Sequence, residues 1–252
     1  MKPFSLDIVK DKEVEKKKPF CRRRRYLCSD TKLGCCGCCA AWPLGIFFVM
    51  FLAAWAQTFP STKFTNIKYD VDGTTVHAYL AEPVSPTNST PAAILFHAWN
   101  GMSEEMTYFA DQLAKQGYYA IVPDLFRGTA SPGLNILWNV LMVMSTPREQ
   151  MNLDSDAALQ YLKTIGNVDQ DRISSGPGFC FGGSEALIFA SRHKLAATVT
   201  CYGSYIKELH DKDAKAWGSL KTGGPVLGIY GEEDTMPPPE SVKKFEKALN
   251  DL

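Results

Sequence analysis

Cysteine is scarce where a folded domain would need it to form disulfides. The 252-residue chain has eight cysteines, but only Cys180 and Cys201 lie beyond residue 39. A disulfide framework would spread cysteines through the fold, so the sequence excludes a small disulfide-stabilised protein. The length is sufficient for one α/β domain of ordinary size with an appended segment.

Net charge is also absent, because 27 Lys and Arg residues balance 27 Asp and Glu residues. The balance is uneven along the chain: basic residues crowd the first 32 positions, and the remainder is mildly acidic. An acidic surface repels phosphate backbones, so we expect the folded part not to bind nucleic acid. The sequence likewise has no Gly-rich phosphate loop and no dinucleotide-binding fingerprint.

A third absence is that of charged residues between positions 33 and 62. The centre of this segment, residues 40–56, is strongly apolar. A helix of ~20 residues, rising ~1.5 Å per residue, crosses the ~30 Å hydrocarbon layer of a bilayer. Trp42 and Trp55 lie near the two ends of the apolar run, where an aromatic belt is expected. We therefore predict a transmembrane signal anchor over residues 33–59.

A cleaved signal peptide, followed by secretion, is the competing interpretation, since Ala54-Trp55-Ala56 fits a cleavage site. The long basic segment before the apolar run favours a retained, single-pass anchor. Basic residues stay on the cytoplasmic side, so we expect residues 1–32 to be a disordered cytosolic tail and the following domain to be luminal or extracellular. A glycosylation sequon at Asn88 agrees with that side of the membrane.

Four of the early cysteines cluster beside the predicted anchor: Cys35, Cys36, Cys38 and Cys39. Cysteines next to a membrane span are typical sites of S-acylation. A zinc knuckle is the alternative, but four ligands within five residues cannot easily surround one tetrahedral ion, and no histidine follows nearby. Acylation is the interpretation that we favour.

The remaining residues, 60–252, show the pattern of an α/β domain. Alternating apolar residues on both sides of Asp72-Gly73 predict a β-hairpin. Short apolar runs typical of buried parallel strands follow at residues 91–97, 118–124, 195–203 and 225–231, with helical patterns at residues 105–116, 153–165 and 241–249. A connector over residues 127–150 has an apolar centre at 134–144, which fits a lid, a membrane contact or a helix packed on the sheet.

The segment Gly178-Phe179-Cys180-Phe181-Gly182-Gly183 has the pattern of a nucleophile elbow, in which a strand turns sharply into a helix. Glycines are needed in such a turn because a Cβ would collide with the neighbouring strand or the helix. A sulfur at the helix N-terminus is expected to be stabilised as thiolate. The N–H of Phe181 would point to the position of a substrate oxyanion. An ordinary buried cysteine is the alternative interpretation of Cys180.

These motifs resemble the dienelactone hydrolase family, the cysteine-nucleophile branch of the α/β-hydrolases, over about residues 65–252. The resemblance also rests on the strand–loop–helix–strand run from residue 91 to Phe126. It implies a doubly wound, mostly parallel α/β sheet, here preceded by the transmembrane helix, and no metal and no organic cofactor. It places the second oxyanion N–H at Trp99 and the catalytic acid at Asp234. The sequence departs from the family pattern at Ala98, where a glutamate is usual, and at Pro177, where an aliphatic residue is usual.

The histidine of the implied triad should follow the helix after Asp234, and the given chain has no histidine there. We therefore expect a hydrolase of carboxylic esters or lactones that lacks its last strand and histidine loop, with turnover impaired. The alternative is a catalytically inactive, ligand-binding membrane protein of the same fold. A third possibility is that His210 serves as a substitute base. The expected partners are a small ester or lactone and, through the anchor, the membrane.

Overall fold

The computed structural model describes residues 6–9, 61–130, 136–203 and 220–252. Its strands are β1 (Leu6–Val9), β2 (Ile67–Val71), β3 (Thr74–Ala81), β4 (Thr90–Phe96), β5 (Tyr119–Pro123), β6 (Val168–Phe179), β7 (Ala197–Cys201) and β8 (Val226–Gly231). Its helices are α2 (Glu104–Lys115), α3 (Ile136–Ser145), α4 (Arg148–Thr164), α5 (Phe181–Ala190) and α8 (Pro239–Asn250), with short 3-10 helices η1 (Ser61–Phe64) and η2 (Leu220–Gly223).

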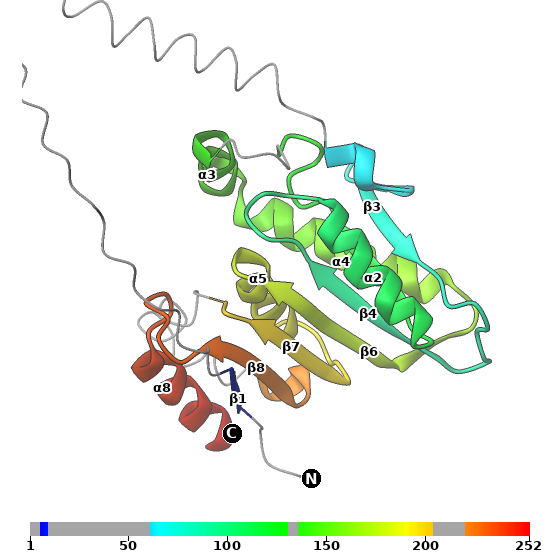
Figure 1. Ribbon diagram of the computed structural model, residues 1–252. Helices are drawn as coiled ribbons and strands as arrows, with labels where there is room; N and C mark the ends of the chain where they lie inside the picture. The colour runs from blue at the N-terminus through cyan, green and yellow to red at the C-terminus, as the bar shows by residue number, and fades with distance from the viewer. Residues whose placement is uncertain (1–5, 10–60, 131–135, 204–219) are drawn as a thin grey trace, which may run out of the picture. The chain divides into compact units, whose positions relative to one another are not determined.

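The strands form one eight-stranded sheet in the order β1-β8-β7-β6-β4-β5-β3-β2. Neighbours from β1 to β5 in this order are parallel, whereas the pairs β5–β3 and β3–β2 are antiparallel. The prediction of a mostly parallel α/β sheet is therefore confirmed (Figure 1). The central strands β6 and β4 are adjacent, so the loops that follow them lie at the same edge of the sheet.

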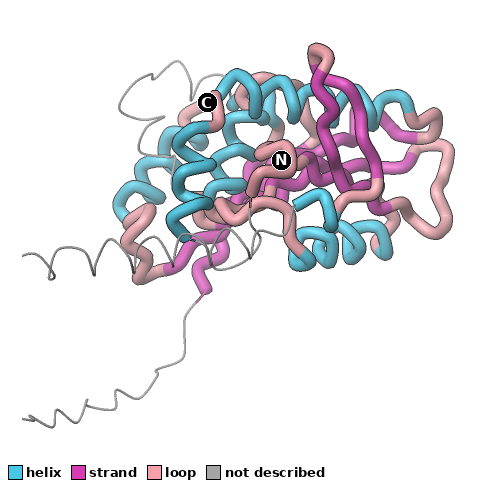
Figure 2. The backbone as a smooth tube through the Cα atoms, turned by 90° about the horizontal axis from the view of Figure 1, so that it is seen from above, coloured by secondary structure: helices cyan, strands magenta, loops and turns pink. Residues whose placement is uncertain are grey.

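Helices cover both faces of this sheet (Figure 2). The buried residues of β4 alternate between two apolar clusters: Ile94 and Phe96 face the cluster that includes α4, α5 and α8, whereas Ala93 and Leu95 face the cluster that includes α2. This period of two is the pleat of a strand buried on both sides. The core therefore has two layers, with β4 between them.

The predicted hairpin joins β2 and β3. Asp72 and Gly73 both have positive φ, 51° and 78°, as a two-residue turn that follows the twist of the strands requires. The side chain of Asp70 accepts a hydrogen bond from the N–H of Gly73 at 2.9 Å. Asp72-Gly73 was therefore a reliable signal for the turn.

Strand β6 differs from expectation, because it continues through the Pro177 segment that seemed unsuited to a central strand. The pairing of β6 with β7 shifts register between Ser175 and Gly178, so Pro177 lies in an irregular stretch of the ladder. Gly176 has a φ of +88°, and a Cβ there would approach the carbonyl oxygen of Val199 to 2.0 Å. A bulge at a glycine thus accommodates a proline that cannot donate to the ladder.

Helix α4 begins at Arg148, five residues before the helix predicted from residue 153. Its first turn, after Pro147, is polar, so the apolar periodicity alone did not reveal it. The apolar connector before it contains α3, whose Val143 packs against the larger apolar cluster.

Part of the basic segment expected to be without structure forms β1, which pairs in parallel with β8. The predicted anchor and the four clustered cysteines lie outside the described residues. Within the described ranges, none of the helices combines the length and the apolar character needed to cross a bilayer.

Candidate active site

Cys180 occupies the turn between β6 and α5. Its φ of 56° and ψ of −114° are unusual for any residue other than glycine. The conformation is held by two backbone hydrogen bonds: Cys180 N–H donates to the carbonyl oxygen of Cys201 at 3.0 Å, and the N–H of Gly183 donates to the carbonyl oxygen of Cys180 at 3.0 Å. Strain of this kind persists where the surroundings over-determine it, which is common at catalytic residues.

The glycines of the elbow permit close contact of backbone with backbone. A Cβ on Gly178 would lie 2.1 Å from the carbonyl oxygen of Gly182, and a Cβ on Gly182 would lie 2.1 Å from that of Phe96 in β4. Side chains at these positions would force α5 away from the sheet. The sequence prediction of a tight strand-to-helix turn at this place is confirmed.

The thiol of Cys180 is half-buried and free. Burial raises the pKa of Cys180; the backbone N–H of Phe181, which hydrogen-bonds to the sulfur, lowers it, and the nearby charge of Asp234 raises it further. Burial of the sulfur thus acts against the stabilised thiolate that the sequence leads us to expect at this helix N-terminus. Burial raises the pKa of Cys201 to about 11, and this second thiol is only 6% exposed.

Asp234 follows β8, at the same edge of the sheet as Cys180. Its carboxylate accepts a hydrogen bond from the N–H of Met236 at 3.0 Å and is close enough to Cys180 to affect the pKa of the thiol. The two side chains that the sequence proposed as nucleophile and acid thus follow parallel strands of one sheet, at the same edge.

No histidine in the described ranges is placed to act as a general base beside Cys180 and Asp234. The ring of His97 is completely buried and uses both nitrogens: Nδ1–H donates to Ala98 at 2.8 Å, and Nε2 accepts from the N–H of Leu125 at 3.1 Å. His193 Nε2 is 2.7 Å from an oxygen of Asp156 on α4. His77 lies in β3, far along the sheet order from β6. His210 is outside the described residues.

The loop after β4 contains Trp99, the expected second oxyanion donor. The N–H of Gly101 donates to the carbonyl oxygen of Ala98 at 3.0 Å, which closes a turn around Trp99. Gly101 has a φ of +78°, and a Cβ there would approach Cβ of Ala130 to 2.4 Å. The turn is therefore closed by a backbone hydrogen bond and leaves no room for a side chain at Gly101, and the Trp99 N–H remains a proposed oxyanion donor.

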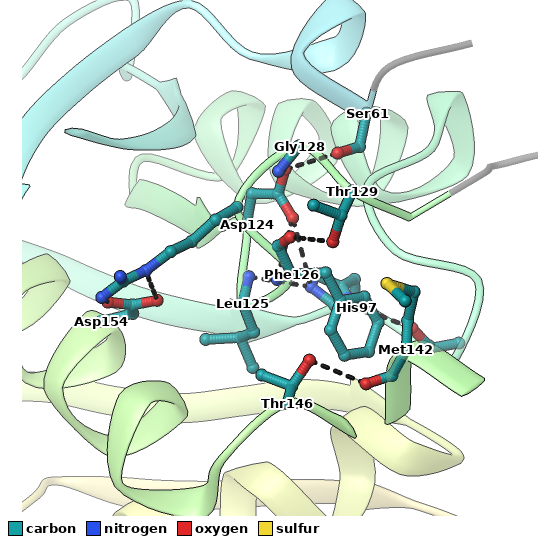
Figure 3. Close-up of polar contacts among 12 residues, drawn as sticks. Ser61, His97, Asp124, Leu125, Phe126, Gly128, Thr129, Met142, Thr146 and Asp154 are labelled. Atoms are coloured by element: carbon teal, nitrogen blue, oxygen red, sulfur yellow. Dashed lines mark hydrogen bonds and ion pairs between the residues drawn. The ribbon is translucent and has the colours of Figure 1, made fainter. Parts of the chain in front are cut away.

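A buried polar network around Asp124 and His97 joins the end of β4 to the loop after β5 (Figure 3). One carboxylate oxygen of Asp124 accepts from the hydroxyl of Ser61 at 2.5 Å and from the N–H of Gly128 at 2.9 Å, and the other accepts from the N–H of Phe126 at 3.1 Å. His97 Nε2 is 4.0 Å from the same carboxylate. Burial lowers the pKa of His97 more than Asp124 raises it, so the ring is neutral.

Two features of the site escaped the sequence analysis. Tyr202, directly after β7, has a φ of 41° and is 41% exposed. Burial raises its pKa, as do the charges of Cys180, Cys201, Glu105 and Asp234. Phe181 stacks on Phe126, with ring centroids 5.5 Å apart. The position after a parallel strand next to the elbow was the available signal for Tyr202.

The sheet is mostly parallel and has helices on both faces, which is the arrangement of an α/β-hydrolase-type fold. The dienelactone hydrolase family model matches residues 76–252, and the chain belongs to this family of hydrolases.

Three relatives illustrate the similarity. A candidate carboxymethylenebutenolidase of Yersinia pestis is 33% identical over 184 residues, which cover 70% of this chain and 68% of that protein. A similar protein of Salmonella typhimurium is 30% identical over 184 residues, covering 70% and 67%. The crystal structure of a candidate dienelactone hydrolase from Klebsiella pneumoniae has a TM-score of 0.63 and 26% identity, covering 73% of this chain and 80% of that one.

Proposed function

We propose that this chain hydrolyses carboxylic esters or lactones with Cys180 as the nucleophile. The observation that carries the proposal is the strained, half-buried Cys180 at the elbow, with the N–H of Phe181 directed at its sulfur. The names of the relatives from Yersinia and Salmonella refer to a butenolide, which is a cyclic ester, and this supports lactones within the substrate class.

In the proposed reaction the Cys180 thiolate attacks the carbonyl carbon, forming a C–S bond and an oxyanion. The N–H groups of Phe181 and Trp99 stabilise that oxyanion. Collapse breaks the ester C–O bond, the leaving alkoxide takes up a proton, and a thioester with Cys180 remains. Water then attacks the thioester, releasing the acid and restoring the thiol.

The proton transfers are the weak part of this scheme for residues 1–252. A free cysteine with a pKa of about 8.5 is only a few per cent thiolate at neutral pH, and burial raises the pKa of Cys180. General acid–base assistance contributes ~10²–10⁴-fold to such reactions. We therefore propose that this chain acylates slowly and deacylates more slowly still, unless His210 or a histidine beyond residue 252 supplies the base.

Intact mass spectrometry after incubation with p-nitrophenyl acetate tests the nucleophile. We expect one added acetyl group, mapped to Cys180, which Cys180→Ala abolishes and Cys201→Ala retains. An adduct that survives Cys180→Ala contradicts the assignment.

Turnover of this chain should rise by orders of magnitude when a family-type C-terminal strand and histidine loop are appended. Equal turnover of the two chains contradicts the missing-base argument.

A ligand-binding protein without turnover is the second candidate. It is favoured by the raised pKa of Cys180 and by the engagement of His97 and His193 with other groups. Binding of an ester by the extended chain without acylation of Cys180 would support this candidate over the hydrolase.

We further propose that the domain lies outside the cytosol on a single-pass anchor, with S-acylation of the Cys35–Cys39 cluster. Asn88 is exposed in the turn before β4, as a glycan requires. Strand β1 belongs to the N-terminal tail and β8 to the domain, and their pairing holds tail and domain on one side of the membrane. A cytosolic tail would therefore require β1 to separate from β8. Glycosidase treatment with protease protection on microsomes tests the topology, and palmitate labelling with and without hydroxylamine tests the acylation. Digestion of the domain by external protease, without any glycan at Asn88, contradicts the topology.

A further inference from the structure

Helix α3 exposes an unusual amount of apolar surface. Its ten residues, Ile136–Ser145, include no charged side chain. Five of its large apolar side chains are exposed: Ile136 (61%), Leu137 (64%), Val140 (42%), Leu141 (50%) and Met144 (80%). Single exposed apolar residues are ordinary, whereas a contiguous set marks an interaction surface.

The five exposed residues recur at spacings of one, three and four, so they form one stripe along the helix. The opposite side of α3 packs on the domain: Asn139 is buried, and Val143 contacts the larger apolar cluster. We call the exposed residues the α3 stripe. Because the other side of α3 is occupied, the stripe faces away from the core.

The loop after β5, residues 124–129, is hydrogen-bonded both to α3 and to Ser61. The carbonyl oxygen of Thr129 accepts a hydrogen bond from Nε1 of Trp138 at 2.8 Å. In the same loop, Asp124 holds the hydroxyl of Ser61 (Figure 3). Ser61 is the last residue but one of the uncharged run that begins at residue 33. The C-terminal end of that run and α3 are therefore attached to one loop.

We propose that the α3 stripe inserts into the interfacial layer of a lipid bilayer, beside the end of the uncharged run. This inference rests on the anchor proposed above: if that anchor ends near residue 60, Ser61 lies at the membrane surface, and the loop that Ser61 shares with α3 places α3 there too. Helices lying in the interface bury their apolar side chains among the headgroups and acyl chains. The α3 helix enters this layer without burying any charge.

A second copy of the chain fits the stripe less well. A ten-residue helix is ~15 Å long and ~10 Å wide, so its outer side offers far less than the ~800 Å² per partner of a stable interface. A bilayer has no such minimum area, because the proposed anchor would already hold the domain at its surface.

Photocrosslinking in the full chain tests the proposal. A benzophenone amino acid replaces Leu141 in one protein and Val84 in the control; Val84 is 92% exposed and lies in the loop between β3 and β4. Both proteins are reconstituted in nanodiscs of phosphatidylcholine and irradiated, and the adducts are identified by mass. We expect a phospholipid adduct at position 141 and none at position 84.

A second pair of variants separates insertion from mere proximity. Leu137→Asp with Met144→Asp should remove the lipid adduct at position 141, whereas Val84→Asp should leave it unchanged. Circular dichroism and the urea midpoint of each variant verify that it is folded. Lipid adducts at both 141 and 84, a crosslink to a second copy or to residues 33–57, or no adduct at 141 would each overturn the proposal.

Discussion

The turns that follow β6 and β4 meet at one edge of the sheet, but different forces hold them. The elbow after β6 depends on the absence of side chains, with helix and strand backbones in contact at Gly178 and Gly182. The loop after β4 is joined through His97 to the loop after β5, whose polar groups form a buried network around Asp124. The elbow is rigid for steric reasons, whereas the network is stable only while its donors and acceptors stay paired.

Adding a methyl group to the elbow is expected to have the largest effect on stability. Gly182→Ala places a Cβ 2.1 Å from the carbonyl oxygen of Phe96, and backbone in the central strand cannot move aside. We expect a loss of about 4 kcal/mol or more in the free energy of unfolding, or no folded protein. Gly166→Ala is the control, since a Cβ there has nothing within 4 Å; its effect should stay within about 0.5 kcal/mol. Similar urea midpoints for the two variants would refute the steric account.

Neutralising Asp124 should have a smaller effect. In Asp124→Asn, an NH₂ group replaces one of the carboxylate oxygens that accept from Ser61, Gly128 and Phe126. Loss of buried hydrogen bonds to a charged group is worth about 2 kcal/mol. Asp251→Asn, which removes an exposed pair with Lys247, should cost no more than about 0.5 kcal/mol. Equal urea midpoints for the two variants would show that the network is not stabilising.

The pH dependence of stability should distinguish the network from the elbow. Burial lowers the pKa of His97 in the folded state, so below about pH 6.5 the unfolded chain binds a proton that the folded ring does not. Stability should then fall as pH falls, by about 1.4 kcal/mol per pH unit, until the folded ring also titrates. His97→Gln should lose this contribution and His77→Gln should retain it, as measured by urea unfolding at several pH values. A slope that persists unchanged in His97→Gln would contradict the assignment.

Sequence patterns revealed the elbow better than the network for a physical reason. The glycines and Cys180 lie within six consecutive residues, and their steric requirement is local. The partners Ser61 and Asp124 are 63 positions apart, and His97 and Leu125 are 28 apart. Each of these residues also has an ordinary role as a loop or strand residue, so nothing in the sequence indicated that they are paired.

In the sheet, too, local features could be predicted from the sequence, whereas features that depend on distant segments could not. Apolar runs predicted its parallel strands and Asp72-Gly73 predicted its hairpin, because both signals are periodic or local. The passage of β6 through Pro177 depends on a bulge set by β7, and the proximity of Tyr202 to Cys180 depends on strand order. Neither can be derived from one segment alone.

The smallest predicted effect concerns the charge beside Cys180. Asp234 raises the pKa of this thiol, so Asp234→Asn should lower it and increase the thiolate fraction at a fixed pH. Carbamidomethylation of Cys180 by iodoacetamide near neutral pH should then be faster by about threefold, the size expected for one charge at a partly screened site. Glu233→Gln, next to it in an exposed position, should leave the rate nearly unchanged.

Cys201 provides the internal reference for that experiment. With a pKa of about 11 and little exposure, it should react after Cys180 in every variant, as followed by peptide mass spectrometry. Slower labelling of Cys180 in Asp234→Asn would mean that Asp234 activates the thiol rather than restraining it. Labelling of Cys201 first would mean that the elbow does not present its sulfur to solvent. The first outcome would change the role proposed for the acid, and the second would remove the nucleophile from the proposed mechanism.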